Sequence, residues 1–450
     1  MKKVFAVFIA IAVIIMFVIG IKKLMTPSEK SEQKQVALKY LPVYTNDKWG
    51  VINSSGDIVI EPTYAEAIII PDSSKAVFIC TYDVDYTKGT YKTKVLDEKG
   101  SEIITGYDSV EAIENYDSSN TMWYESGVLK VKKDGKYGLV DLKGNKLAEC
   151  EYSSIDALKG TTNSLITKKD EKYGLLDNTG ATILGNEYKS IKPISDKYEN
   201  GYIVQNESGK YGVINWNKTV AVDTKYDDVK QLYSNGNYYV VKENGKWKIV
   251  DTVGGSYLTG EYDDITAIDG DYIVAKKSNK YGVVSILDSE VVVPLTYDLV
   301  VPASSKKYIV KTNGKYGVVD RENTKILEAK YLRLVYRSDA SFYEGANSDN
   351  TSDLLDLTLN VKVTGIVSMI NTKDGYIRVR VDDEYKYYNF KFEEKDSKEI
   401  LKDNTIFLSK KNGKYGFIDK NGVVVVDYIY DDATEQNEFG YASVKKDGVV

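Results

Sequence analysis

The chain has 450 residues, of which 42% are apolar, 60 are basic and 66 are acidic, and it contains no histidine. The apolar share is sufficient for a buried core, but this length exceeds what one compact core usually holds, so a repetitive architecture is expected. The lack of histidine excludes Ser-His and Cys-His nucleophile pairs, the usual zinc hydrolase centres and histidine-based pH switches.

The first predicted element is a membrane-spanning helix. Lys2 and Lys3 precede an uninterrupted apolar run over residues 4–21, which would span about 27 Å as a helix, close to the hydrocarbon thickness of a bilayer. Neither an A-x-A cleavage site nor a lipobox cysteine follows, so a retained signal anchor is favoured over a cleaved signal peptide or a buried soluble helix. We therefore expect residues 1–25 to form a single-pass anchor in the cell membrane, with the bulk of the chain extracytoplasmic.

A polar juxtamembrane linker over residues 26–41 is predicted next. The first 25 residues contain four lysines and no acidic residue, so the remainder has 56 basic and 66 acidic residues, a net charge of about −10. Because a nucleic-acid-binding protein needs a basic face, the acidic body predicts no nucleic-acid partner. Cys80 and Cys150 form no CxxC pair; two buried thiols are favoured, and a disulfide between them stays open.

From about residue 42 onward, a phrase of lysine and an aromatic residue, in most copies followed by glycine, recurs with a period of about 35 residues, which indicates a repeat architecture. The 38 tyrosines, together with Val, Ile and Thr, favour strands. The clear copies contain Trp49 and Gly50, Tyr137 and Gly138, Tyr173 and Gly174, Tyr211 and Gly212, Trp247 (followed by Lys248), Tyr281 and Gly282, Tyr316 and Gly317, and Tyr415 and Gly416. Degenerate copies near residues 97, 356 and 385 bring the number to about eleven.

Each unit is predicted to contain three short strands and a connecting corner. An alternating strand leads into an Asn-Gly or Asp-Gly turn, as at residues 313–314, which is typical of a type I′ hairpin. The return strand ends at Asp or Asn with Gly three residues later, as at Asp141 and Gly144, the pattern of a type I turn. After a third strand, a second tyrosine lies 15 or 16 residues beyond the first aromatic and opens the corner.

The phrase is interpreted as architecture, because the chain contains no GxxxxGK[ST] phosphate loop. Its aromatic should pack in the core or between repeats, and its glycine should let a neighbouring aromatic lie over the backbone. The predicted fold is all-β, a tandem array of three-stranded β-hairpin repeats over residues 42–450. An open superhelix is favoured over a closed propeller, whose blades usually have four strands and number four to eight. A further copy stops at Val450, which indicates a truncated cap or a fragment.

The phrases at residues 46–56, 134–144 and 412–422 resemble the WG-type (KWG) repeat family of bacteria. The resemblance covers nearly everything from about residue 42 to the end, with Tyr in place of Trp in most copies. It implies β-rich repeat units and at most a binding role, and it brings no catalytic residue and no cofactor.

These observations predict a membrane-anchored, extracytoplasmic, non-catalytic binding or scaffold module for a protein or envelope-glycan partner, without cofactor or metal. The alternative is a carboxylate-dependent hydrolase acting on cell-envelope polysaccharide. Calcium binding through Asp227, Asp228, Asp263 and Asp264 is a further hypothesis, although their recurrence at the corner favours a turn or solvent role. Residues 333–353 form the longest break in the pattern; a degraded repeat with a mobile loop is favoured over an arginine- and tyrosine-containing recognition loop.

Overall fold

The structure, a computed structural model, describes residues 38–232, 238–252, 255–258, 261–372, 375–381, 384–396, 406–419, 422–434 and 442–447. Within these ranges it is all-β, as predicted, and consists of many small antiparallel sheets with a single 3-10 turn, η1 (Tyr198–Asn200). The predicted membrane helix over residues 4–21 lies outside the described residues. No helix within the described ranges is long and apolar enough to span a membrane.

The strands of the described ranges follow one another through eleven sheets in chain order. Two three-stranded sheets come first, with β1 (Tyr40–Thr45), β2 (Lys48–Asn53) and β3 (Ile58–Tyr64), then β4 (Phe78–Asp85), β5 (Thr90–Leu96) and β6 (Glu102–Ile104). Three four-stranded sheets follow. The first contains β7 (Ser109–Tyr116), β8 (Met122–Lys133), β9 (Lys136–Asp141) and β10 (Lys146–Tyr152), and the second contains β11 (Ser154–Ala157), β12 (Leu165–Lys169), β13 (Lys172–Leu176) and β14 (Thr182–Tyr188). The third contains β15 (Ser190–Pro193), β16 (Tyr202–Gln205), β17 (Tyr211–Ile214) and β18 (Val220–Tyr226).

The second half of the chain continues in the same way. A three-stranded sheet contains β19 (Asp228–Val229), β20 (Tyr239–Glu243) and β21 (Lys246–Val250). The next sheet has four strands, β22 (Asp264–Asp269), β23 (Tyr272–Lys277), β24 (Lys280–Ser285) and β25 (Val291–Tyr297). Another four-stranded sheet contains β26 (Leu299–Pro302), β27 (Lys307–Thr312), β28 (Lys315–Asp320) and β29 (Lys325–Tyr331). A seven-stranded sheet contains β30 (Arg333–Arg337), β31 (Phe342–Ala346), β32 (Ser352–Leu355), β33 (Val361–Asn371), β34 (Tyr376–Val381), β35 (Glu384–Asn389) and β36 (Glu394–Lys395). The last sheets contain β37 (Ile406–Lys411), β38 (Lys414–Asp419) and β39 (Val424–Tyr430), then β40 (Asp432–Ala433) and β41 (Val444–Lys445).

The regular sheets have four strands, whereas three strands were predicted for each repeat unit. The difference arises because the predicted corner is itself a strand. β11 pairs with β12, and β26 pairs with β27, so each corner strand joins the hairpin of the following repeat. Each corner strand here has only four residues, which is why its sequence resembles a connection. A four-stranded sheet therefore takes strands from two consecutive repeats.

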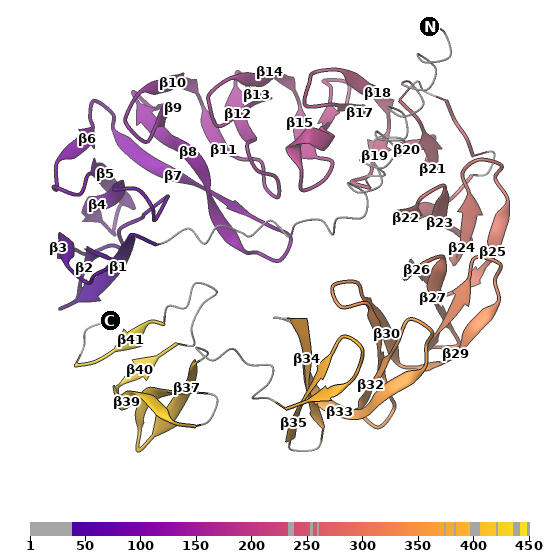
Figure 1. The fold of residues 1–450 in the computed structure, drawn as a ribbon. Coiled ribbons are helices and arrows are strands. Elements are labelled where there is room, and N and C mark those ends of the chain that lie inside the picture. Colours follow the sequence, from indigo (N-terminus) through magenta and orange to yellow (C-terminus); the bar gives the residue numbers. More distant parts are fainter. Residues whose placement is uncertain are drawn as a thin grey trace, which may run out of the picture.

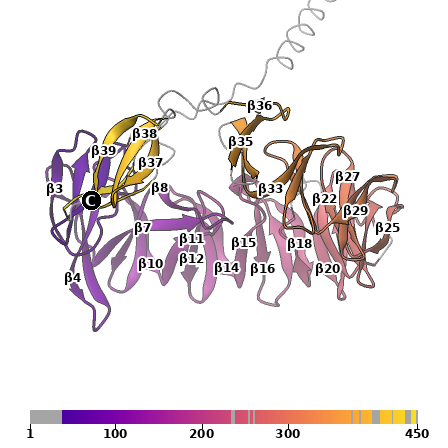
Figure 2. The same cartoon turned by 90° about the horizontal axis from the view of Figure 1, so that it is seen from below.

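The sheets follow one another around a ring, in which the C-terminal sheets lie beside the N-terminal ones in both views (Figures 1 and 2). The favoured open superhelix is therefore not the arrangement seen, which is closer to the closed alternative. The short corner strands β11, β15 and β26 lie on the inside and the longer strands β10, β14 and β29 on the outside (Figure 1). The inner strands β11, β15 and β26 have four residues each, and the outer strands β10, β14 and β29 have seven.

Residues 333–353 do not form a mobile loop, as the sequence had suggested, but the ordered strands β30, β31 and the start of β32. Buried Glu344 accepts from Arg333 Nη2 at 2.6 Å and pairs with Arg337 Nε at 3.3 Å. Two of the arginines that suggested a recognition loop thus hold β30 against β31. The seven-stranded sheet arises because β33 continues without a break from one unit into the next and pairs with both β32 and β34.

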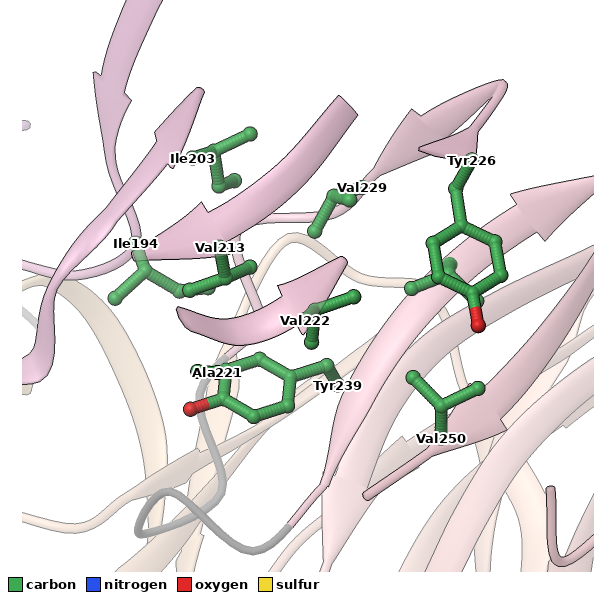
Figure 3. Close-up of a cluster of buried hydrophobic side chains, with 10 residues drawn as sticks. Ile194, Ile203, Val213, Ala221, Val222, Tyr226, Val229, Tyr239 and Val250 are labelled. Carbon is green, nitrogen blue, oxygen red and sulfur yellow. The ribbon is translucent and has the colours of Figure 1, made fainter. Parts of the chain in front are cut away.

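Apolar side chains fill the space between neighbouring sheets. Figure 3 shows Ile203 and Val213 of one sheet packed with Val229 and Val250 of the next. Alternate residues of one strand face opposite neighbours: Ile203 belongs to this cluster, whereas Tyr202 and Val204 pack in the preceding one. This explains the continuous apolar character of the hairpin strands, which are buried on both faces. Cys80 is buried, Cys150 is half-buried, and both are free thiols.

Candidate binding groove

The aromatics of the repeated phrase pair across strands with the second tyrosine of the same unit. The pairs are Trp49 with Tyr64, Tyr137 with Tyr152, Tyr173 with Tyr188, Tyr211 with Tyr226, Trp247 with Tyr262, Tyr281 with Tyr297, Tyr316 with Tyr331 and Tyr415 with Tyr430. The spacing of 15 or 16 residues in the sequence is therefore one recurring cross-strand pair. These predicted structural residues occupy equivalent positions but are not brought together into one site.

Lysines on the preceding strand extend this row in six units. Lys311 faces Tyr316 in the strand register, and its ammonium lies 5.1 Å from the ring centroid. The same arrangement joins Lys132 to Tyr137, Lys168 to Tyr173, Lys242 to Trp247, Lys276 to Tyr281 and Lys410 to Tyr415. A cation over a ring is attracted by the negative face of the π-system. The phrase thus builds rows of lysine, aromatic and tyrosine that stabilise each sheet.

The glycine after the aromatic serves a close approach of backbone, not the packing of an aromatic ring. At Gly317, an added Cβ would lie 2.4 Å from the carbonyl oxygen of Leu327 and 2.8 Å from the nitrogen of Ala329. The strand register shifts at this point, so the bulged outer strand crosses directly over the glycine. Gly50, Gly138, Gly174, Gly212, Gly282 and Gly416 have equivalent backbone neighbours. The predicted aromatic cover is therefore wrong at these positions.

Lys248 follows Trp247 in β21, where the other clear copies of the phrase have glycine. The described residues of the following segment form two isolated bridges with β21, Trp247–Tyr262 and Val250–Ser256. Among the described residues, the sheet that contains β21 has three strands.

The predicted turns are confirmed. Asn313 and Gly314 have φ angles of 50° and 77°, as a type I′ hairpin requires. In the second turn, Gly144 donates its backbone N–H to the Asp141 carbonyl at 3.0 Å. The Asp141 carboxylate also accepts the backbone N–H groups of Lys143 and Asn145, both at 2.8 Å. These local contacts give the repeat its fixed strand lengths.

The corner aspartates link adjacent repeats. Asp263 accepts from Lys246 Nζ at 2.7 Å and from the Ser278 backbone N–H at 2.8 Å, so it connects one unit to the hairpin turn of the next. The pairs Lys210–Asp227, Lys280–Asp298 and Lys414–Asp431 are equivalent. In each case the lysine hydrogen bond is the main cause that lowers the pKa of the aspartate.

The same contacts bear on the calcium hypothesis. Asp227 and Asp263 hold lysines, Asp228 accepts from the Val229 N–H at 2.8 Å, and Asp264 accepts from the Ile265 N–H at 2.9 Å. Within the described ranges no group of three or more acidic or sulfur ligands is placed to hold a metal ion. The aspartates at the corner thus have structural partners, which favours the turn role.

These aspartates predict that acid destabilises the fold. Because their folded-state pKa lies below the unfolded value, their contribution to stability is complete above about pH 3.9 and is lost as the pH falls through the folded-state pKa. We expect the melting temperature to decrease once the pH is below about 4. This acid limb of the pH profile should be flatter in the quadruple variant Asp227→Asn, Asp263→Asn, Asp298→Asn and Asp431→Asn. Thermal melts between pH 2.5 and 7 test this, with Asp223→Asn as the control. An unchanged acid limb in the quadruple variant contradicts it.

A groove of about 830 Å³ lies between the β4–β6 and β7–β10 sheets. Tyr86, Tyr91, Tyr116 and Tyr124 line it, together with Glu66, Glu111, Glu114, Asp156 and Lys130. We call this feature the tyrosine groove. It lies in the interval between residues 49 and 137 where the repeat is degenerate, so the interrupted period was the signal in the sequence, but the groove residues themselves were not predicted.

The long β7–β8 hairpin, which reaches toward the middle of the ring (Figure 1), builds one wall of the groove. Glu114 pairs with Tyr124, and Tyr116 lies two residues after Glu114, so all three side chains share the face that lines the groove. Asn115 and Trp123, the next cross-strand pair, point to the opposite face. Strand alternation therefore separates groove residues from supporting residues.

Buried Glu125 anchors the supporting face. Its carboxylate accepts four hydrogen bonds, from Asn115 Nδ2 at 2.8 Å, Trp123 Nε1 at 3.3 Å, the Asn163 backbone N–H at 3.0 Å and Asn178 Nδ2 at 2.9 Å. Glu125 is 2% exposed, and no lysine or arginine of the described ranges forms an ion pair with it. Several N–H donors can stabilise a buried carboxylate without a counter-charge. The network connects the hairpin with the loops of the following sheet.

The groove residues are electrostatically coupled. Tyr86 donates to Glu66 at 2.6 Å and Tyr116 donates to Glu114 at 2.7 Å, and in each case this hydrogen bond is the main cause that raises the pKa of the tyrosine. Burial lowers the pKa of Lys130, but the nearby carboxylates of Glu111 and Asp156 outweigh this effect, so the pKa of the lysine is raised. With four carboxylates and one ammonium, the lining is acidic.

Among solved structures, similar ones include a eukaryotic initiation factor (TM-score 0.33, 11% identity, 72% of this chain and 94% of that chain). BamB from Moraxella catarrhalis is also similar (TM-score 0.28, 11% identity, 58% of this chain and 94% of that chain). So is Hsv2 from Kluyveromyces lactis (TM-score 0.28, 8% identity, 57% of this chain and 94% of that chain). TM-scores this low establish no shared fold. No curated protein sequence matches the chain.

The family described as WG containing repeat matches residues 49–69, 211–247, 287–316 and 415–449. These segments contain the phrase aromatics Trp49, Tyr211, Trp247, Tyr316 and Tyr415, whose cross-strand pairs are described above. The chain is thus one that contains the WG repeat, in four matched segments spread along the array.

Proposed function

We propose that this WG-repeat chain is a non-catalytic binding or scaffold protein that holds a protein or cell-envelope glycan partner in the tyrosine groove. The observation that carries the proposal is the groove itself, in which Tyr86 and Tyr91 are 74% and 50% exposed beside the β7–β8 hairpin. Exposed aromatics of this kind supply large contact areas at low conformational cost. The regular aromatics of the phrase, in contrast, are paired within their sheets.

Partner capture tests the proposal. The immobilised chain should retain an envelope protein or glycan that the double variant Tyr86→Ser and Tyr91→Ser loses. The matched control is Trp216→Ser, because Trp216 is also an exposed aromatic (51%) and lies outside the groove. A partner retained equally by all three proteins would exclude the groove as its site. Release of shortened glycan by the wild type would instead favour the hydrolase alternative, with the groove carboxylates as its acids.

We also propose that the protein is anchored in the cell membrane with its repeats extracytoplasmic, on the basis of the apolar run over residues 4–21. Full-length protein should stay with membranes in alkaline carbonate, whereas a variant lacking residues 1–25 should be released. The fraction in the pellet, read by immunoblot, is the measurement. Complete extraction of the full-length chain by carbonate would refute the anchor, and protection of the repeats from external protease in intact cells would refute the orientation.

A further inference from the structure

The tyrosine groove also indicates which chemical class of ligand it takes, an inference that rests on the proposed binding function. We propose that it binds a cationic partner, namely an extended protein segment that presents lysine or arginine side chains to Glu66 and Glu114.

The groove already holds one ammonium group of its own. Lys130 Nζ lies 3.2 Å from Glu111 Oε2, 3.5 Å from Asp156 Oδ1 and 5.3 Å from the ring centroid of Tyr137. Two carboxylates and an aromatic face thus surround this amine, which is only 16% exposed. This is the chemistry expected of a site for lysine or arginine.

The remaining two carboxylates of the groove are hydrogen-bonded to tyrosine hydroxyls. Glu66 and Glu114 each accept a hydrogen bond from a tyrosine hydroxyl, Tyr86 at 2.6 Å and Tyr116 at 2.7 Å. No lysine or arginine of the described ranges forms an ion pair with either carboxylate. Because an ionised carboxylate has about four acceptor sites, one hydroxyl leaves capacity for an ammonium or guanidinium group.

The size and charge of the groove favour an extended basic segment over other partners. About 830 Å³ is far more than one side chain fills, so several residues of a partner can enter. Four carboxylates against one ammonium repel an anionic polymer, and a neutral saccharide has no charge to match them. The exposed faces of Tyr86 and Tyr91 add cation–π contacts to the carboxylate pairs.

Fluorescence anisotropy tests the inference with the full chain in mild detergent. The probe is a labelled nine-residue peptide of alternating lysine and glycine, and its lysine-acetylated form is the uncharged control. The wild type should bind the first and not the second. The double variant Glu66→Gln and Glu114→Gln should bind about tenfold more weakly. The variant Asp223→Asn and Glu328→Gln removes the same charge from exposed positions on β18 and β29 and should bind within about twofold of the wild type.

Three results would overturn the inference: no binding of the lysine peptide by the wild type, equal binding of the acetylated peptide, or equal losses in the two double variants. Envelope capture separates this failure from failure of the proposed function. If the lysine peptide does not bind but a captured envelope partner is lost from the Tyr86→Ser and Tyr91→Ser variant, the groove binds a ligand that is not cationic. If neither peptide binding nor partner capture depends on the groove, both proposals are wrong.

Discussion

Replacing Glu125 with alanine should lower the free energy of unfolding by about 3 kcal/mol, because one buried and three partly buried N–H donors lose their shared acceptor. The donors come from β7, β8 and the loops of the next sheet, so the loss should affect both sheets. Urea unfolding measures the total, and amide hydrogen exchange around residues 158–164 measures the local part. Glu125→Gln should also destabilise the fold, because the NH2 group of its amide would face N–H groups that themselves need an acceptor.

The matched control is Glu328→Ala, which removes an exposed carboxylate (77% exposed) from a surface ion pair and should cost less than about 1 kcal/mol. Equal effects of the two substitutions would show that Glu125 contributes no more than a surface charge. Because Tyr124 precedes Glu125 and faces the groove, Glu125→Ala should also weaken ligand binding without removing a groove residue.

Gly317→Ala should strongly destabilise the repeat, with a loss of about 3 kcal/mol or more in the free energy of unfolding. Its new methyl group would lie 2.4 Å from the Leu327 carbonyl oxygen, where only a shift of the outer strand can relieve the clash. Thermal and urea unfolding measure the loss. We expect β29 to exchange its amide hydrogens faster, as the pairing of β28 with β29 is weakened.

Gly185→Ala is the control, since Gly185 is also a strand glycine but an added Cβ would meet nothing within 4 Å. It should change stability by less than about 1 kcal/mol, with a tendency to stabilise through the lower entropy of the unfolded chain. If Gly317→Ala were as well tolerated as Gly185→Ala, the close approach of the outer strand would not be the reason for the glycine.

Sequence reasoning reached the repeat because its signals are local. Asn313 and Gly314 specify a type I′ turn through their own φ preferences, and Asp141 and Gly144 specify the second turn through contacts within five residues. The role of Gly317 was misjudged for the opposite reason. The group that it accommodates is backbone of another strand, and a bulge in that strand has no clear signature in its sequence.

The sequence by itself determined the all-β class, the period, the turn types and the structural role of the repeated aromatics, since each follows from residues close together in the chain. The tertiary structure decided that the corner is a fourth strand, that the sheets follow one another around a ring and that residues 333–353 contain strands. It also decided the tyrosine groove, which joins side chains from Glu66 to Asp156, and the Glu125 network, whose donors reach Asn178. Such contacts depend on how separate sheets pack, which a pattern within one repeat cannot specify.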